Sequence, residues 1–554
     1  MEILVIGLLG MLAVAGASAL SERVGVAAPL LLVVVGLVVS QLPGVPVVEV
    51  DPEWVLAGIV PPLLFSSAVS MPTMNFRREF GAISGLSVLL VVASTAVIGV
   101  VLAAVVPGLG LAAGFALGAI LSPTDAVATG IVKRVGVSAR VTTVLDGESM
   151  LNDATALVVL RAAIAATAAS VSIGGVLGDF ALAVAVAVAV GLAVGWVGLR
   201  VRARVSAARV GTVISYALPF AASLPAEALG GSGLVAAVVA GLLTGQGAIR
   251  HLSPQDRLSD RQNWRTMETL LEGAIFLIMG LQLPTVLGDL HADGGSVGQG
   301  VALAALALVL TLVVRAAYTA PLLALQRRLS RRKTSERSEL QLTDQALDSG
   351  VISYRGRSRD IEPENVDRFR SRLRRRMADI DYLLAEPLGA REGAVIVWAG
   401  MRGAVTLAAA QTLPEDAPQR SLLVVVAFLV AAASLLFQGS TLAWVVHRVK
   451  PAGPDPEAAA AERDELQSRM RAVAIEVLKR HPTQPWAAEF LERSAEKAGT
   501  PDPTAMSDLR LEMIRAQRES LVAARAEGRF DAAALSAALE TLDAEQINIE
   551  MRAG

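Results

Sequence analysis

The sequence has no cysteine and few charged side chains. The absence of cysteine excludes disulfides, thiolate metal sites and cysteine nucleophiles. Charged residues make up 18% of the 554 residues, against about 25% in an average soluble domain. Residues 80–124 carry no charge at all, and such a run would fill two membrane crossings of about 20 residues each. We therefore expect an all-α polytopic membrane protein, and not a soluble enzyme, a disordered chain or a nucleic-acid binder.

Apolar runs separated by polar breaks predict thirteen transmembrane helices. Their ranges are 3–20, 26–42, 54–72, 81–106, 111–131, 141–168, 174–199, 210–226, 231–249, 268–288, 298–326, 393–413 and 421–447. The first range has an alternative interpretation as a signal peptide, because Ala-Gly-Ala-Ser-Ala (15–19) resembles a cleavage site. Its first residues include Glu2 and no Lys or Arg, so we expect a retained helix.

Positive charge alternates between successive loops. The odd-numbered loops carry Arg23; Arg77 and Arg78; Lys133, Arg134 and Arg140; Arg200, Arg202, Arg204 and Arg209; and Arg250, Arg257, Arg261 and Arg265. The even-numbered loops, such as 43–53 and 289–297, are nearly free of Lys and Arg, with Arg420 as the exception. Positive loops stay in the cytoplasm. The pattern predicts an outside N-terminus and a cytoplasmic tail for a protein of the inner (plasma) membrane.

The hydrophilic segments divide the chain. We predict a transmembrane domain over 1–450, a cytoplasmic basic insert within it at 327–391, and a helical cytoplasmic domain over 451–554. The insert contains Arg-Leu-Arg-Arg-Arg (372–376); it is either an ordinary cytoplasmic loop or a surface helix held by anionic lipid. The last segment has 19 acidic and 13 basic residues, a net charge of −6, and Glu457–Arg480 has helical composition.

Ionisable residues inside a span are costly and are candidates for function. Span five contains Leu-Ser-Pro-Thr-Asp-Ala-Val-Ala (121–128). Pro123 lacks a backbone donor and disfavours helix at Ser122, so a break is predicted beside Asp125. Irregular backbone at this depth has to line a cavity or be buried in protein. The alternative is a plain proline kink with Asp125 near the cytoplasmic end.

Span six contains Asp-Gly-Glu-Ser-Met-Leu-Asn-Asp-Ala-Thr (146–155). Helical spacing places Glu148, Asn152 and Thr155 on one face, with Ser149 and Asp153 on an adjacent stripe. Such a helix has to face other helices rather than lipid. Oxygen ligands without soft ones suit a hard cation, and a purely structural polar network is the alternative.

Span twelve contains Gly-Met-Arg-Gly-Ala-Val-Thr-Leu-Ala (400–408). Two glycines flank Arg402, which indicates a helix interruption or a close backbone approach. A guanidinium buried there needs a partner, and we predict a bidentate ion pair with Glu148. Spans five and twelve are seven helices apart, as in an inverted repeat of spans 1–6 and 8–13. Paired interrupted helices at corresponding repeat positions indicate a transporter's binding site near the membrane midplane.

These motifs resemble the bacterial sodium/proton antiporters of the monovalent cation:proton antiporter-1 family. The resemblance rests on 122–128, 147–158 and 400–408, with weaker support from 268–276, and covers about residues 1–447. It implies thirteen helices, an inverted-repeat fold with crossed discontinuous helices, and a homodimer. It also implies a secondary active antiporter, not an enzyme, that exchanges Na⁺ for H⁺ in pH and sodium homeostasis.

The resemblance also implies roles for particular residues. Asp153 would be the carboxylate that binds the cation or the proton, and Asp125 the second acid of the Na⁺ site. Further oxygens would come from Ser149 and, through its backbone, from Thr124, with Asn152 in support. Glu148 and Arg402 would form a structural ion pair. The electrogenic relatives have an aspartate where this chain has Asn152, which points to electroneutral one-for-one exchange.

The role of Arg161 and the class of activity each have more than one interpretation. Arg161 lies two turns after Asp153; it either extends to the outer surface or lines an outward funnel. Asp125 and Asp153 could form an intramembrane aspartyl protease dyad, but the Gly-x-Gly-Asp and Tyr-Asp settings of that chemistry are absent. A cation channel is the other alternative. No ATP-binding loop or cofactor motif is visible, so ion gradients are the expected energy source. The partners are monovalent cations, protons and membrane lipids.

Overall fold

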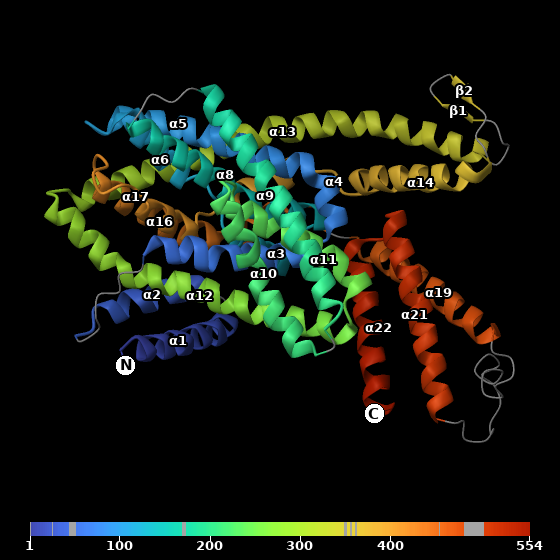
Figure 1. The fold of residues 1–554 in the computed structure, drawn as a ribbon. Coiled ribbons are helices and arrows are strands. Elements are labelled where there is room, and N and C mark those ends of the chain that lie inside the picture. The colour runs from blue at the N-terminus through green and yellow to red at the C-terminus, as the bar shows by residue number, and fades with distance from the viewer. Residues whose placement is uncertain are drawn as a thin grey trace. The chain divides into compact units, whose positions relative to one another are not determined.

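The computed structural model describes residues 2–24, 26–43, 51–168, 173–205, 207–347, 352–354, 357–359, 363–453, 455–480 and 503–553. The loop predicted at 43–53, the insert and the tail lie partly outside these described residues. The described part is almost entirely helical (Figure 1), as the composition predicts; a hairpin of β1 (Ile352–Tyr354) and β2 (Arg357–Arg359) is the exception.

The first helices are α1 (Glu2–Val24), α2 (Ala28–Ser40), α3 (Val60–Ser70), α4 (Thr73–Ser84), α5 (Leu90–Val105), α6 (Gly110–Ile120), α7 (Val127–Val135), α8 (Ala139–Ala168), α9 (Ile173–Arg202), α10 (Ala208–Ala228) and α11 (Gly233–His251). They are followed by α12 (Pro254–Ala292), α13 (Val297–Leu347), α14 (Pro363–Ala385), α15 (Ala390–Trp398), α16 (Ala404–Gln411), α17 (Arg420–Ser434), α18 (Ser440–Val449), α19 (Pro456–Arg480), α21 (Pro503–Glu527) and α22 (Ala532–Ala553). Short π-helical segments η1 (Trp54–Ile59), η2 (Gly85–Leu89) and η3 (Leu435–Gly439) adjoin α3, α5 and α18.

Every predicted span coincides with helix in the structure. Among the described residues, seven helices are long and apolar enough to cross a membrane by themselves. They are Thr73–Val105, Ala139–Ala166, Gly178–Arg202, Gly233–His251, Pro254–Ala292, Val297–Gln345 and Arg420–Val449. The remaining predicted spans are shorter apolar helices, interrupted helices, or, for 210–226, the 21-residue helix α10, which is not among the seven. The count of thirteen crossings stays a prediction.

Two of the predicted spans are interrupted near their middles. The span containing Pro123 is α6 and α7, with no helix from 122 to 125 between them. The span containing Arg402 is α15 and α16, with no helix from 400 to 403. The breaks predicted from a proline and from a glycine pair are therefore both confirmed.

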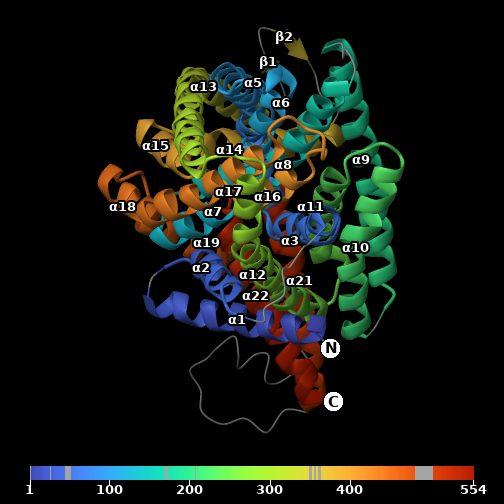
Figure 2. The same cartoon turned by 90° about the vertical axis from the view of Figure 1, so that its left-hand side faces the viewer.

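The chain forms two compact units, and the first contains the interrupted helices. It comprises residues 1–252, 259–324 and 388–452. Within it α9, α10 and α11 pack side by side, and α11 also packs on α3 (Figure 2). α5 packs on α6, and α6 on α8, so that the interrupted helix is enclosed by continuous ones.

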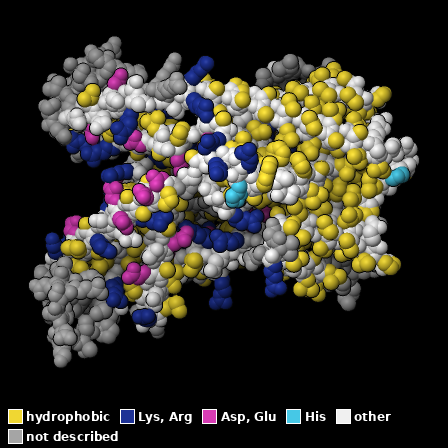
Figure 3. Space-filling view, turned by 180° about the vertical axis from the view of Figure 1, so that it is seen from behind, with side chains coloured by type: hydrophobic (Ala, Val, Ile, Leu, Met, Phe, Trp, Pro, Cys, Tyr) yellow, Lys and Arg dark blue, Asp and Glu magenta, His cyan; other side chains and the backbone are white. Residues whose placement is uncertain are grey.

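The outside of the first unit is apolar. Figure 3 shows a wide field of hydrophobic side chains with few charges among them. Exposed large apolar residues of the unit include Leu89, Val97, Val100, Leu182, Trp196, Val213, Leu224, Val309, Val313, Phe437 and Trp444. Exposed apolar surface of this extent marks a membrane or protein interface, and with the spanning helices it makes the chain a multi-pass membrane protein.

The second compact unit comprises residues 253–258, 325–387 and 453–554. The end of α13 and α14 pack together through Leu340, Leu347, Leu373 and Ile380. Within the basic run 372–376, Arg376 pairs with Glu336 at 3.0 Å and Arg374 lies 3.8 Å from Asp344. The tail is helical where it is described, in α19, α21 and α22, as predicted.

α19 and α21 are joined by a pH-sensitive ion pair. Arg469 donates hydrogen bonds of 3.0 and 2.9 Å to the two oxygens of Glu527, and these bonds lower the pKa of that carboxyl. A carboxyl whose pKa is lowered by folding stabilises the fold above its ordinary pKa, and the contribution disappears as the pH falls. The pair is half-exposed, so its contribution is modest.

Asp543 of α22 joins two arginines of the second unit. It accepts hydrogen bonds of 2.8 Å from Arg257 Nε and 3.0 Å from Arg518. Replacing it by asparagine would leave two guanidinium groups facing each other, and removing one partner of a buried pair costs about 3–5 kcal/mol. We expect Asp543→Asn to make α22 sensitive to limited proteolysis. The exposed Asp464 of α19 supplies the matched control, Asp464→Asn. Equal protease resistance of both variants would contradict the assigned role.

Candidate functional site

The two breaks meet each other. The backbone N–H of Asp125 donates to the carbonyl of Met401 at 2.8 Å. Arg402 Nε donates to the carbonyl of Leu121 at 2.7 Å, and its backbone N–H donates to Ser434 Oγ at 2.8 Å. These hydrogen bonds join the two breaks directly, so the two discontinuous helices cross where each is interrupted, as predicted.

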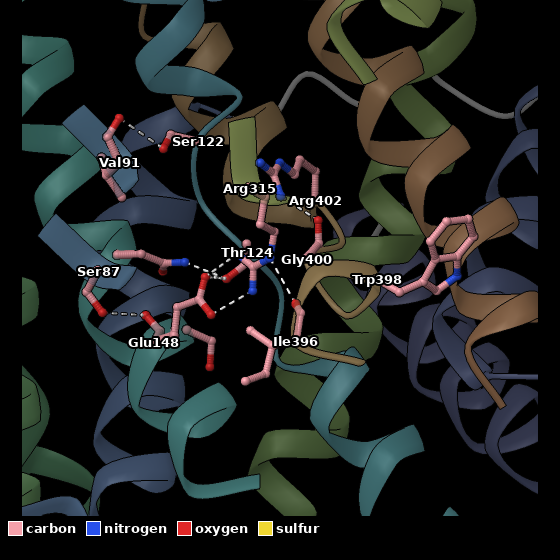
Figure 4. A network of polar contacts seen from close by, with 12 residues as sticks. Ser87, Val91, Ser122, Thr124, Glu148, Arg315, Ile396, Trp398, Gly400 and Arg402 are labelled. Atoms are coloured by element: carbon pink, nitrogen blue, oxygen red, sulfur yellow. Dashed lines mark hydrogen bonds and ion pairs between the residues drawn. The ribbon is translucent and has the colours of Figure 1, made fainter. Parts of the chain in front are cut away.

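Each broken helix end leaves backbone groups that need partners. Carbonyls at the C-terminal ends of α6 and α15 carry partial negative charge. Arginine side chains donate hydrogen bonds to carbonyls at both ends (Figure 4). Arg402 bonds the carbonyls of Leu121 and Gly400, and Arg315 Nε bonds that of Ile396 at 2.9 Å. The N-terminal end of α7 carries the opposite partial charge, and there Asp125 Oδ1 accepts a hydrogen bond from the backbone N–H of Val127 at 3.1 Å.

The predicted ion pair between Glu148 and Arg402 is wrong. Glu148 is paired with Arg315 of α13, which donates to both carboxylate oxygens, with the Nη2 bond at 2.7 Å. Both side chains are 2% exposed. Arg402 is occupied with the carbonyls left open by the helix breaks, so the carboxylate takes the other guanidinium.

The two polar stripes of α8 have separate surroundings. Asn152 donates to Thr124 Oγ1 at 2.6 Å, and Thr124 Oγ1 donates to Glu148 at 3.4 Å. The first stripe thus joins the ion-pair network of Figure 4. Ser149 and Asp153 of the second stripe are buried and line a cavity instead. The helical spacing of α8 therefore places the residues of the ion-pair network on one face and the residues that line the cavity on another.

The cavity lies beside the break of α6 and α7 and has a volume of about 80 Å³. It is lined by Val60, Leu63, Leu64, Ser67, Pro123, Thr124, Asp125, Ala126, Ser149, Met150, Asp153, Glu272, Ile275, Phe276, Gly403, Val405 and Thr406. The residues predicted from sequence as cation- or proton-binding groups therefore line one cavity, apart from Asn152, which donates a hydrogen bond to Thr124.

Carboxylates from three elements face this cavity. The charge of Asp125 acts on both Asp153 and Glu272. Gly403 lies directly against the Asp125 carboxylate, where a Cβ would collide with it. Among the described residues no three His, Cys, Asp or Glu side chains converge closely enough to hold a resident metal ion.

The sequence reasoning missed Arg315 and Glu272. Each lies inside a predicted span, 298–326 and 268–288 respectively, where an ionisable side chain is by itself a functional signal. Glu272 lies within the segment 268–276, which carries part of the family resemblance. Arg161 is exposed and does not line the cavity.

Comparison with known proteins shows what the chain is similar to. A family model described as "Sodium/hydrogen exchanger, transmembrane" matches residues 9–358 and 367–448. The uncharacterized Na⁺/H⁺ exchanger YjcE of Escherichia coli is 36% identical over 256 residues, which are 43% of this chain and 45% of that protein. The chain thus matches less than half the length of that relative.

Two further likenesses cover more of the chain. An uncharacterized Na⁺/H⁺ exchanger of Mycobacterium tuberculosis is 26% identical, over 99% of this chain and 97% of that protein. The structure of the sodium proton antiporter MjNhaP1 from Methanocaldococcus jannaschii matches with a TM-score of 0.54 and 15% identity. That match covers 81% of this chain and 99% of the other, and it concerns the fold alone.

Proposed function

The chain belongs to the sodium/hydrogen exchanger family, and from this premise we propose how it exchanges monovalent cations for protons across a membrane. We propose that Asp153 binds either a proton or a cation, most simply Na⁺. Asp125, Ser149 and Thr124 supply further oxygens, and Asn152 positions Thr124 through its 2.6 Å hydrogen bond. The observation that supports this is the shared cavity of Asp153 and Asp125 at the crossing of two interrupted helices.

One carboxylate that takes either ligand couples the two fluxes. A bare carboxylate is costly to move through a low-dielectric region, whereas the protonated or cation-bound group is not. If only the loaded site crosses, each turnover moves one cation one way and one proton the other. Asn152 carries no charge, so the exchange we propose is electroneutral.

The protein needs no bound cofactor in this scheme, because the ion gradients supply the energy. We propose alternating access through movement of the interrupted helices against the rest of the first unit. We also propose a homodimer in the inner membrane, with the basic loops and the tail in the cytoplasm. There it would serve pH and sodium homeostasis, and these roles are those of a transporter rather than an enzyme.

Competition at one carboxylate predicts a specific pH dependence. In proteoliposomes of the full-length protein, acid should raise the apparent KM for sodium, because protons occupy Asp153. Saturating sodium should largely relieve the inhibition. The measurement varies pH and sodium independently while a pH-sensitive dye reports the proton flux.

Voltage separates this scheme from its alternatives. With the membrane potential set by potassium and valinomycin, a one-for-one exchange rate should not change with voltage. A channel would conduct sodium along the potential without counter-movement of protons. A strong voltage dependence, or acid inhibition that saturating sodium leaves in place, would contradict electroneutral exchange at one carboxylate.

A further inference from the structure

A third carboxylate faces the cavity from a helix outside the two interrupted ones. Glu272 of α12 lines it together with Ile275 and Phe276, which are 6% and 2% exposed. We infer that Glu272 sets the affinity of the cavity for the transported cation, with Thr406 as a neutral oxygen ligand on the side of α16. The inference rests on the proposed function and extends it to two residues that the motifs do not assign.

The surroundings of Glu272 leave its charge without compensation. Within the described residues no hydrogen bond or ion pair reaches its carboxylate, and the charges that act on it are those of Glu268 and Asp125, both of the same sign. Arg315 is taken by Glu148, and Arg402 by backbone carbonyls. A carboxylate in such a place calls for a cation in the adjoining space.

Thr406 gives an independent indication of a ligand. Its side chain is 0% exposed and lines the cavity, and its hydroxyl oxygen has no hydrogen-bond partner in the described part of the chain. Buried hydroxyl groups are nearly always paired, so an unpaired one in a cavity wall is suited to a bound ion or its water. A hydroxyl also fits the all-oxygen ligand set that hard cations prefer.

The cavity volume fits a partly hydrated monovalent ion. A volume of about 80 Å³ exceeds the roughly 10–15 Å³ that one water molecule needs by the same measure. Because the three carboxylates do not converge on one point, we place the ion nearest Asp153 and Asp125, with Glu272 acting across the cavity. Its contribution is then electrostatic attraction, which raises affinity without a role in the coupling step.

Glu268 provides a matched control for Glu272. It lies one helical turn earlier on the same face of α12 and does not line the cavity. Ser66 Oγ donates to its carboxylate at 3.5 Å, a bond that glutamine can also accept. Glu272→Gln and Glu268→Gln therefore remove the same charge from adjacent turns, only one of which faces the ion.

The test measures cation-dependent proton flux with Na⁺ and Li⁺ in proteoliposomes of the full-length protein. We expect Glu272→Gln to raise the apparent KM for sodium about tenfold, with the maximal rate largely retained. Glu272→Asp should lie between that variant and wild type. Thr406→Val should raise KM by a smaller factor, Thr406→Ser should restore it, and Glu268→Gln should leave it near the wild-type value.

A structural role would give another pattern. If Glu272 only supported the fold, Glu272→Gln would lower the folded yield without changing KM in the protein that folds, and that result would overturn the inference. Equal KM changes in Glu272→Gln and Glu268→Gln would overturn it as well. Should Glu272→Gln not fold, Glu272→Asp decides by the same comparison of KM.

Binding measured without transport separates this inference from the proposed function. Sodium should raise the thermal unfolding temperature of the detergent-solubilised wild type by mass action, and Glu272→Gln should shift that response to higher sodium. A wild type that binds sodium through Glu272 but shows no proton flux would refute the exchange scheme alone. Exchange with an unaltered sodium response in Glu272→Gln would refute only the role of Glu272.

Discussion

Asp153→Asn should abolish cation/proton exchange while leaving the protein folded. Asparagine is nearly isosteric with aspartate, so the packing of α8 is retained, but an amide neither takes up a proton at neutral pH nor neutralises a cation. Asp153 is 7% exposed and lines the cavity, so bulk water does not replace the carboxylate that the substitution removes. Proton flux driven by a sodium gradient in proteoliposomes should fall to the level of empty vesicles.

The control for this variant lies two turns earlier on the same helix. Asp146 pairs with Lys133 at 2.8 Å and does not line the cavity. Asp146→Asn should therefore retain most of the exchange. Unimpaired exchange by correctly inserted Asp153→Asn would show that the coupling carboxylate is a different residue, with Asp125 as the next candidate.

The spans and their breaks could be predicted because their causes are local. Pro123 lacks a donor, and its ring disfavours helix at the preceding residue, which agrees with the end of α6 at Ile120. The glycines at 400 and 403 accommodate the Arg315 guanidinium and the Asp125 carboxylate, respectively. Helical periodicity alone separated Glu148 from Asp153 on α8.

The choice of partner for Glu148 could not be predicted, because it depends on how distant segments are placed. Two arginines, in spans eleven and twelve, are equally plausible by composition and charge. Backbone carbonyls determine the pairing: Arg402 donates hydrogen bonds to the carbonyls of Leu121 and Gly400, and Arg315 pairs with Glu148. Those carbonyls are available only because both helices break, so the pairing follows from the crossing of the two breaks.

The pair of Glu148 and Arg315 gives the largest stability effect that we expect. Arg315→Ala would leave Glu148, 1% exposed as a residue, without its positively charged partner, and would also remove the donor to the Ile396 carbonyl. Breaking a buried pair by removing one member costs about 3–5 kcal/mol. The thermal unfolding temperature in detergent and the folded yield should both fall.

A double-mutant cycle distinguishes the observed pair from the one that the sequence suggested. Glu148→Gln combined with Arg315→Met removes both charges, and replacing a whole buried pair is often neutral, so this double variant should be more stable than Arg315→Met alone. Glu148→Gln combined with Arg402→Met should show little coupling, because Arg402 serves backbone carbonyls that remain in place. A larger coupling with Arg402 than with Arg315 would reassign the carboxylate to the break of α15 and α16, and the two helix ends would then need other donors.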